Sequence, residues 1–161
     1  MEVRAASEDD WAGIWPVWRQ VVATGDAYVW LPGTPEHEAR ASWMLPPPAE
    51  VWVAEEDGRI VGTALLQPNK PGLGDHVANA GFLVDRSVAG RGVGRCLAEA
   101  VLDRAREAGY VAMQFNAIVA TNDRAVGLWR SMGFEEVGRV PQAFRHARHG
   151  PVDLLLMHRR L

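Results

Sequence analysis

The sequence predicts an α/β protein in which one mixed sheet is flanked by helices. Three observations carry this prediction. A tight-turn signal joins two strand patterns near residue 57, a glycine-rich turn links an apolar stretch to an amphipathic helix, and a second capped helix precedes the last strands. A meander of strands followed by alternating strands and helices gives a mixed sheet covered by helices. A chain of 161 residues with 48% hydrophobic residues is expected to form a single domain over residues 1–161.

The N-terminal half is expected to place two helices among short strands. Ser7 caps the first helix, and the acidic residues after it favour the positive end of the helix dipole. Three consecutive prolines stop the second helix. Glu56-Asp57-Gly58 is a hairpin signal. The expected elements are a strand at 2–5, a helix at 7–24, an aromatic-rich loop at 25–35, a helix at 36–45, and strands at 51–55 and 59–67.

The C-terminal half is expected to alternate strands and helices. Gly109 closes the helix that follows the glycine-rich turn, and Asn122 and Gly133 suit the N-cap and C-cap of the next one. The expected elements are a strand at 77–84, a helix at 92–108, a strand at 110–118, a helix at 122–133, a strand at 134–140, a basic loop at 141–150 and a strand at 152–158.

The glycine-rich turn indicates a site for a phosphate or pyrophosphate. Gly90, Gly92 and Gly94 stand at every second position, directly before a helix. Glycines let backbone N–H groups approach a ligand closely, and N–H groups at a helix start attract anions. Arg91 and Arg95 add positive charge. The alternative is a flexible turn without a ligand. A P-loop is excluded because no Gly-Lys-Ser/Thr follows.

A second segment, Asn122 to Phe134, narrows the interpretation. Together, Ala89-Gly90-Arg91-Gly92-Val93-Gly94 and Asn122-Asp123-Arg124-Ala125-Val126-Gly127-Leu128-Trp129-Arg130-Ser131-Met132-Gly133-Phe134 resemble the two signatures of the GNAT superfamily of acetyl-CoA-dependent N-acetyltransferases. The resemblance covers most of the chain beyond Glu50. It implies a mostly antiparallel sheet whose two central strands splay into a V-shaped cleft, with acetyl-CoA as the cofactor.

The resemblance also implies which residues hold acetyl-CoA. Backbone groups of the strand before the turn would hold the pantetheine arm, backbone N–H groups of the turn would hold the pyrophosphate, and one face of the second signature helix would border the thioester. Asn122 as a pure N-cap is the competing interpretation. The expected cofactor-binding residues are Phe82, Leu83, Val84, Gly90, Arg91, Gly92, Val93, Gly94, Arg95, Asn122 and Trp129.

Two positions depart from the family pattern. Ala89 stands where Gln or Arg is usual, and Trp129 stands where many members have a tyrosine proposed to protonate the leaving thiolate. An indole N–H donates a hydrogen bond but is not a general acid near neutral pH. Trp129 is therefore not expected to supply the proton.

Asn79 and Asn116 are the expected catalytic and substrate-binding residues. Each interrupts an otherwise apolar strand, and a buried amide needs hydrogen-bond partners. Two interpretations stay open: an amide that faces the cleft and holds the substrate, or one that bonds the splayed strand ends. The segments around both residues also resemble a yeast group of proline-analogue acetyltransferases that shares Trp129. In that group the matching asparagines act in substrate binding and catalysis.

The rest of the acceptor site is expected from two loops. Tyr28, in the aromatic loop, would cover one side of the cleft, and Arg145, in the basic loop, would hold a substrate carboxylate. No carboxylate occurs on the strand at 77–84, so the general base is open among His76, His146, His149 and water. For the basic loop, solvated surface is the alternative.

Composition limits the remaining classes of function. A net charge of −3 gives no reason to expect nucleic-acid binding, and no apolar run reaches transmembrane length. Cys96 is the single cysteine, so no intrachain disulfide forms, and no metal site is predicted. A cytoplasmic location is expected, with a homodimer as a possible assembly.

The sequence thus favours an acetyltransferase that acts on a small amine or imino acid, such as a proline analogue or another amino acid, by direct attack in a ternary complex. A protein or peptide N-terminal acetyltransferase is the alternative enzyme. A non-catalytic acyl-CoA sensor is the alternative from another class.

Overall fold

A computed structural model describes residues 1–161 and contains one seven-stranded sheet. The strand order is β1-β2-β3-β4-β5-β7-β6, and every pair is antiparallel except β4 and β5. The strands are β1 (Glu2–Ala5), β2 (Glu50–Glu56), β3 (Arg59–Pro68), β4 (Val77–Val84), β5 (Ala112–Val119), β6 (Glu135–His146) and β7 (Gly150–Arg160). The expected mostly antiparallel mixed sheet is confirmed.

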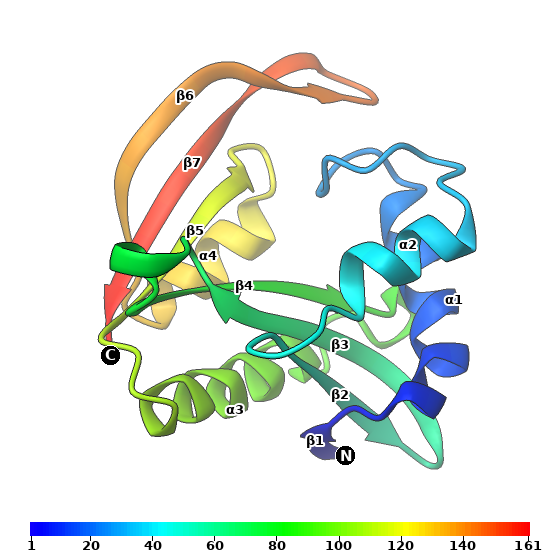
Figure 1. Ribbon diagram of the computed structural model, residues 1–161. Helices are drawn as coiled ribbons and strands as arrows, with labels where there is room; N and C mark the ends of the chain where they lie inside the picture. The colour runs from blue at the N-terminus through cyan, green and yellow to red at the C-terminus, as the bar shows by residue number, and fades with distance from the viewer.

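Four α-helices cover the sheet, two on each face (Figure 1). They are α1 (Trp11–Val22), α2 (Glu36–Trp43), α3 (Val93–Glu107) and α4 (Asp123–Ser131), and short 3-10 turns lie at 8–10, 72–74 and 86–88. The first expected helix therefore begins as a 3-10 turn. One hydrophobic core lies under α3 and α4, and a second lies under α1 and α2, where Trp11, Trp18 and Trp43 are buried. The tryptophans of α1 thus serve the core, as an amphipathic face would.

The sheet splits between its two central strands. β4 pairs with β5 only at Val77↔Ala112 and Ala78↔Met113, although both strands continue for six more residues, to Val84 and Val119. Figure 1 shows β5 turning away from β4 beyond this point. The split confirms the expected V-shaped opening, and beyond Ala78 it leaves the β4 backbone groups that face β5 without a strand neighbour.

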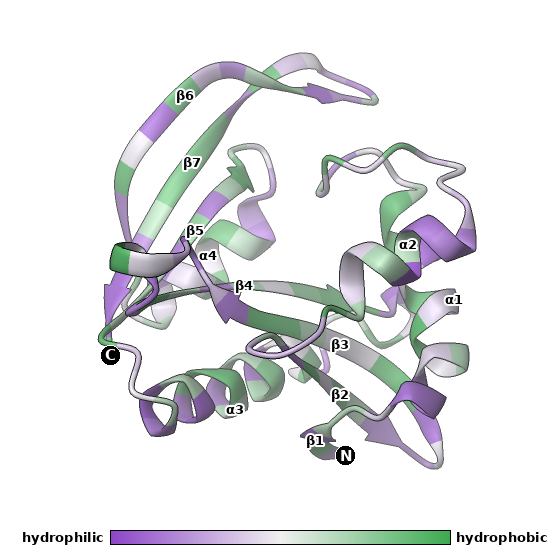
Figure 2. Cartoon of the chain, in the orientation of Figure 1, coloured by the Kyte–Doolittle hydropathy of each residue, from purple (hydrophilic) through white to green (hydrophobic).

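The C-terminal hairpin is longer than the sequence predicts. The expected basic loop at 141–150 is wrong, because β6 continues to His146 and only residues 147–149 form the turn. β6 is the edge strand and is mostly exposed, so polar residues and Pro141 are tolerated there. Two register shifts, at 136/138 and 140/144, curve the hairpin. It arches away from the other strands of the sheet, and β7 is the more hydrophobic of its two strands (Figure 2).

Candidate active site

The glycine-rich turn presents a row of unpaired backbone N–H groups. Gly92 is the N-cap of α3 in the left-handed conformation, with a φ of 83°, and Gly90 has a φ of 87°. The first helical hydrogen bond runs from Cys96 N to Gly92 O. The N–H groups before it that have no acceptor in the protein are those of Gly90, Gly92, Val93, Gly94 and Arg95.

These donors fit a pyrophosphate. They lie at the positive end of a 15-residue helix, and a Cβ built on Gly92 meets nothing within 4 Å, so the space before the helix is open. The turn residues Gly90 to Arg95 therefore lie as the sequence predicts. Whether they bind acetyl-CoA stays a prediction.

The positive charge around the turn is distributed differently from the expected pattern. Arg91 pairs with Glu56 at 2.8 Å, and Arg95 donates to Ser131 Oγ at 2.7 Å. Arg124, which is not among the expected binding residues, has a guanidinium nitrogen 3.5 Å from the position of a Cβ on Gly90. No local pattern marks Arg124, because its place depends on how α4 packs beside the turn.

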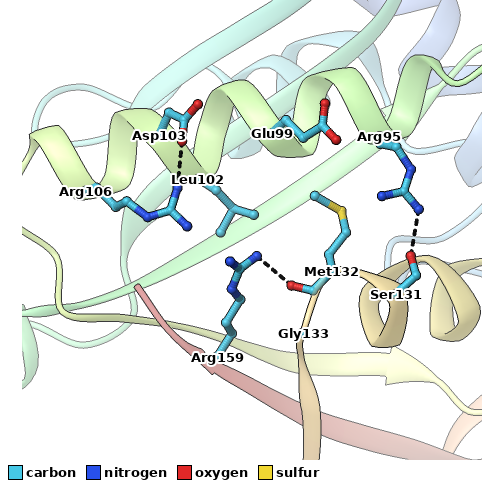
Figure 3. A pocket seen from close by; sticks show the side chains of 9 residues that line it. All are labelled: Arg95, Glu99, Leu102, Asp103, Arg106, Ser131, Met132, Gly133 and Arg159. Atoms are coloured by element: carbon cyan, nitrogen blue, oxygen red, sulfur yellow. Dashed lines mark hydrogen bonds and ion pairs between the residues drawn. The ribbon is translucent and has the colours of Figure 1, made fainter.

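Arg95 also lines a groove of about 580 Å³ beside the turn (Figure 3). The groove lies between α3, the end of α4 and the end of β7. Arg106 pairs with Asp103 along one wall, and Arg159 donates to Met132 O at 2.5 Å on the other. The groove is therefore polar, and each of its three arginines already has a partner.

The edge of β4 that faces the split is set by strand register. Asn69 N donates to Val77 O, and Asp85 N donates to Val61 O, so the odd-numbered residues of β4 bond to β3. Hydrogen-bonding direction alternates along an antiparallel strand, so Ala80, Phe82 and Val84 face the split. Leu83 therefore directs its backbone groups to β3, which corrects the expectation that it holds a cofactor arm through them.

Aromatic side chains close the α4 side of the split. Trp129 is only 5% exposed, and its ring centroid lies 5.0 Å from that of Phe82 on β4 and 4.6 Å from that of Phe115 on β5. Phe134 stacks on Phe115 at 4.5 Å. Trp129 thus contacts both diverging strands from the side of the sheet that α4 covers. Its indole N–H donates to no protein acceptor. At the start of the same helix, Asn122 Oδ1 accepts from Ala125 N at 3.1 Å, so its N-cap role is realised.

Four amide side chains gather on the opposite face of the split. Ala78, Ala80 and Phe115 belong to the core under α3 and α4, so the residues that alternate with them face α1 and α2. The first link bridges the strands: Asn79 Nδ2 donates to Gln114 O at 2.8 Å. Two more hydrogen bonds extend this row of amides. Gln114 Nε2 donates to Asn116 Oδ1 at 3.0 Å, and Asn116 Nδ2 donates to Asn69 Oδ1 at 2.7 Å.

The structure thus brings Asn79 and Asn116 to one place, as expected. It also shows the bonding between strand ends that was the alternative for Asn79. The two roles are compatible, since Asn79 Oδ1 accepts no hydrogen bond within the protein and Asn116 is exposed, in a β5 bulge.

Tyr28 lies beside the amides, in the connection between α1 and α2. Its hydroxyl accepts from Phe82 N at 2.7 Å and donates to Phe82 O at 2.8 Å. Its ring stacks on Trp30 at 5.2 Å and meets the edge of Trp43 at 6.4 Å. Burial raises the pKa of Tyr28, so the phenol stays neutral and keeps its donor proton. The aromatic loop therefore packs against β4 at the split, and its contact with an acceptor stays a prediction.

The other expected acceptor residues lie outside this cluster. Arg145 is exposed on β6, between the buried Phe144 and His146. His146 Nδ1 accepts from Arg148 N at 3.1 Å and from His149 N at 3.3 Å, so this nitrogen is engaged within the hairpin turn. His76 and Asp75 line a separate groove of about 880 Å³ beside Tyr110, at the paired end of β4 and β5.

Comparison with protein families gives one match for most of the chain. A model of the "Acetyltransferase (GNAT) family" matches residues 14–134. The N-acetyltransferase aca1 of Schizosaccharomyces pombe is 38% identical over 95 residues, which cover 58% of this chain and 46% of aca1. The chain therefore spans less than half the length of this curated relative.

Solved structures cover the whole chain. A GCN5-related N-acetyltransferase from Kribbella flavida superposes with a TM-score of 0.95 at 45% identity, over 99% of this chain and 97% of that one. A ribosomal-protein-alanine N-acetyltransferase from Brucella melitensis gives 0.88 at 29%, over all of both chains. The acetyltransferase yncA from Salmonella typhimurium, solved with its cofactor acetyl-CoA, gives 0.84 at 25%, over 100% and 94%.

Proposed function

Because the chain belongs to the GNAT family of acetyltransferases, we propose that it transfers an acetyl group from acetyl-CoA to the nitrogen of a small amine or imino acid. One observation carries the proposal: five unpaired N–H groups at the start of α3 lie next to the open edge of β4, and a row of amides lies on the other face of the same split. A donor and an acceptor can therefore meet across one gap in the sheet.

The residues present fit acetyl-CoA at the turn. Gly90 to Arg95 would bind the pyrophosphate through backbone N–H groups, and Val84 would offer its backbone groups to the arm that follows. Trp129 would form the apolar floor near the reacting end. Bound there, acetyl-CoA supplies an acyl group activated as a thioester.

The amides would hold the acceptor through hydrogen bonds. They would not act as the base, because an amide side chain does not take a proton at neutral pH. Asn79 Oδ1 is free to accept from the N–H of a neutral amine and so to direct its lone pair across the split. Asn116 lies further along the amide chain, in reach of a second polar group of the acceptor. The proton that the amine loses would pass to water, and the CoA thiolate that leaves would take up a proton from water.

Two features favour a small acceptor over a peptide. Tyr28, Trp30 and Trp43 pack together on one side of the cleft. The tip of the β6–β7 hairpin contacts the loop that follows α1, where Ala147 N donates to Gly25 O at 2.9 Å. This contact narrows the access that an extended chain would need. A peptide acceptor is the competing proposal, because the Brucella relative is named as a ribosomal-protein-alanine N-acetyltransferase.

A panel of amines, imino acids and short peptides, assayed by release of free CoA thiol, tests the proposal. We expect turnover with a small amine or imino acid. Asn116→Ala should lower kcat/KM for an acceptor that carries a carboxylate about tenfold to a hundredfold, since a hydrogen bond to a charged group contributes about 1.5–3 kcal/mol. Asn79→Ala should lower it roughly twofold to tenfold, since a hydrogen bond to a neutral amine contributes about 0.5–1.5 kcal/mol. The affinity for acetyl-CoA should stay unchanged. Lower melting temperature and weaker acetyl-CoA binding, without a selective effect on the acceptor, would instead assign both residues to support of the strand ends.

Asn116→Asp separates two kinds of acceptor. The new carboxylate has nearly the same shape and would repel the carboxylate of an amino or imino acid. An acceptor that is a simple amine should be acetylated as well or better by the variant as by the wild type.

The competing proposal would replace this one if the wild-type protein acetylated peptides faster than every small amine in the panel.

A further inference from the structure

Phe82 is the residue of the open β4 edge whose two backbone groups are already occupied. Its neighbours on that edge, Ala80 and Val84, face the split with no strand beside them, whereas the Tyr28 hydroxyl bonds both the N–H and the C=O of Phe82. A peptide-like arm pairs with a strand edge through these same groups. The phenol therefore stands where a strand, or a ligand with amide groups, would bind.

The surroundings of Tyr28 are shaped for this contact. A Cβ on Gly81 would lie 3.4 Å from Tyr28 Oη and 3.3 Å from two ring atoms of Trp43, so the bare backbone lets both rings lie against β4. Trp30 stacks on Tyr28 and also lies 5.3 Å from Trp18, in the core under α1. Displacing the hydroxyl from Phe82 would thus also move the aromatic wall on the acceptor side.

We propose that Tyr28 is a latch on the donor site: its hydroxyl must leave Phe82 before the amide-bearing arm of acetyl-CoA pairs along β4. Donor binding then reshapes the wall formed by Tyr28 and Trp30, so the acceptor site takes its working form only after the donor is present. The inference rests on the proposed function, because it concerns the same donor site.

The test measures CoA binding rather than turnover. Isothermal titration calorimetry with CoA compares the wild-type protein with Tyr28→Phe, which keeps the ring and removes both hydrogen bonds. We expect CoA to bind Tyr28→Phe about tenfold more tightly, because binding no longer breaks the hydrogen bonds between Tyr28 and Phe82. Tyr110→Phe is the matched control, since Tyr110 is the only other tyrosine and lies at the paired end of β4 and β5. It should bind CoA like the wild type.

A second variant and a second signal protect the test. If Tyr28→Phe fails to fold, Trp30→Ala takes its place in the test. It removes the stacking partner of Tyr28 and should also tighten CoA binding. Tryptophan emission of the wild type should shift on titration with CoA, with the same midpoint as the calorimetry. Equal or weaker CoA binding by the folded Tyr28→Phe protein would overturn the latch. A wild-type protein that does not bind CoA at all would instead overturn the proposed function.

Discussion

Gly92→Ala separates the ligand role of the turn from its role in the fold. Gly92 has a φ of 83°, and an L-residue in the left-handed region costs roughly 1–2 kcal/mol. A Cβ there meets no protein atom within 4 Å, so the cost comes from backbone strain alone. For a domain of this size, that strain lowers the melting temperature by about 2–8 °C. The protein should stay folded at 25 °C.

Gly92→Ala should weaken acetyl-CoA binding strongly although it destabilises the fold only slightly. The methyl group would project into the open space before α3, next to the unpaired N–H groups of Gly92, Val93 and Gly94. A hydrogen bond to a charged group contributes about 1.5–3 kcal/mol, so losing one N–H contact to a pyrophosphate weakens acetyl-CoA binding roughly tenfold to a hundredfold. Calorimetric titration with acetyl-CoA measures this loss.

Gly109→Ala is the matched control, at the other end of the same helix. Gly109 has a φ of 88°, and a Cβ there also meets nothing within 4 Å. The substitution should lower the melting temperature by a similar amount and leave acetyl-CoA affinity unchanged. If the two variants bind acetyl-CoA equally well, the turn is not the pyrophosphate site and the reasoning fails.

Two further predictions follow from other parts of the structure. Trp129→Phe should keep most of the acetylation rate, because the indole is a floor and not an acid; a loss near the ~10²–10⁴-fold of a removed acid–base group would contradict this. The second concerns acid stability: hydrogen bonds from Arg4 hold the pKa of Asp10 well below its ordinary value, so this pair stabilises the fold above the unfolded-state pKa of about 3.9 and the stabilisation is lost as pH falls. Asp10→Asn should flatten the loss of stability between pH 7 and pH 3 in urea titrations, and an unchanged pH dependence would count against the pair.

Local signals made parts of the site predictable from sequence. The spacing of Gly90, Gly92 and Gly94 before a helical pattern depends only on neighbouring residues, and so does the cap by Asn122. The end of β6 was missed because an edge strand needs no alternating hydrophobic pattern, and Pro141 and the basic residues there resemble a loop. Arg124 was missed because nothing in its own segment says that it lies over Gly90.

The hydrogen bonds of Asn79 and of Tyr28 share one physical origin in the split of the sheet. Where β5 leaves β4, backbone groups lose the partners that a complete ladder would give them, and unpaired polar groups are costly when they are shielded from water. Two side chains supply partners instead. Asn79 donates to Gln114 O on β5, and the Tyr28 hydroxyl bonds Phe82 N and O on β4. A ligand that pairs with the same edge competes with Tyr28 but not with Asn79, because Asn79 bonds the opposite strand. The two residues should therefore separate by experiment, with Tyr28 variants changing donor affinity and Asn79 variants changing acceptor kinetics.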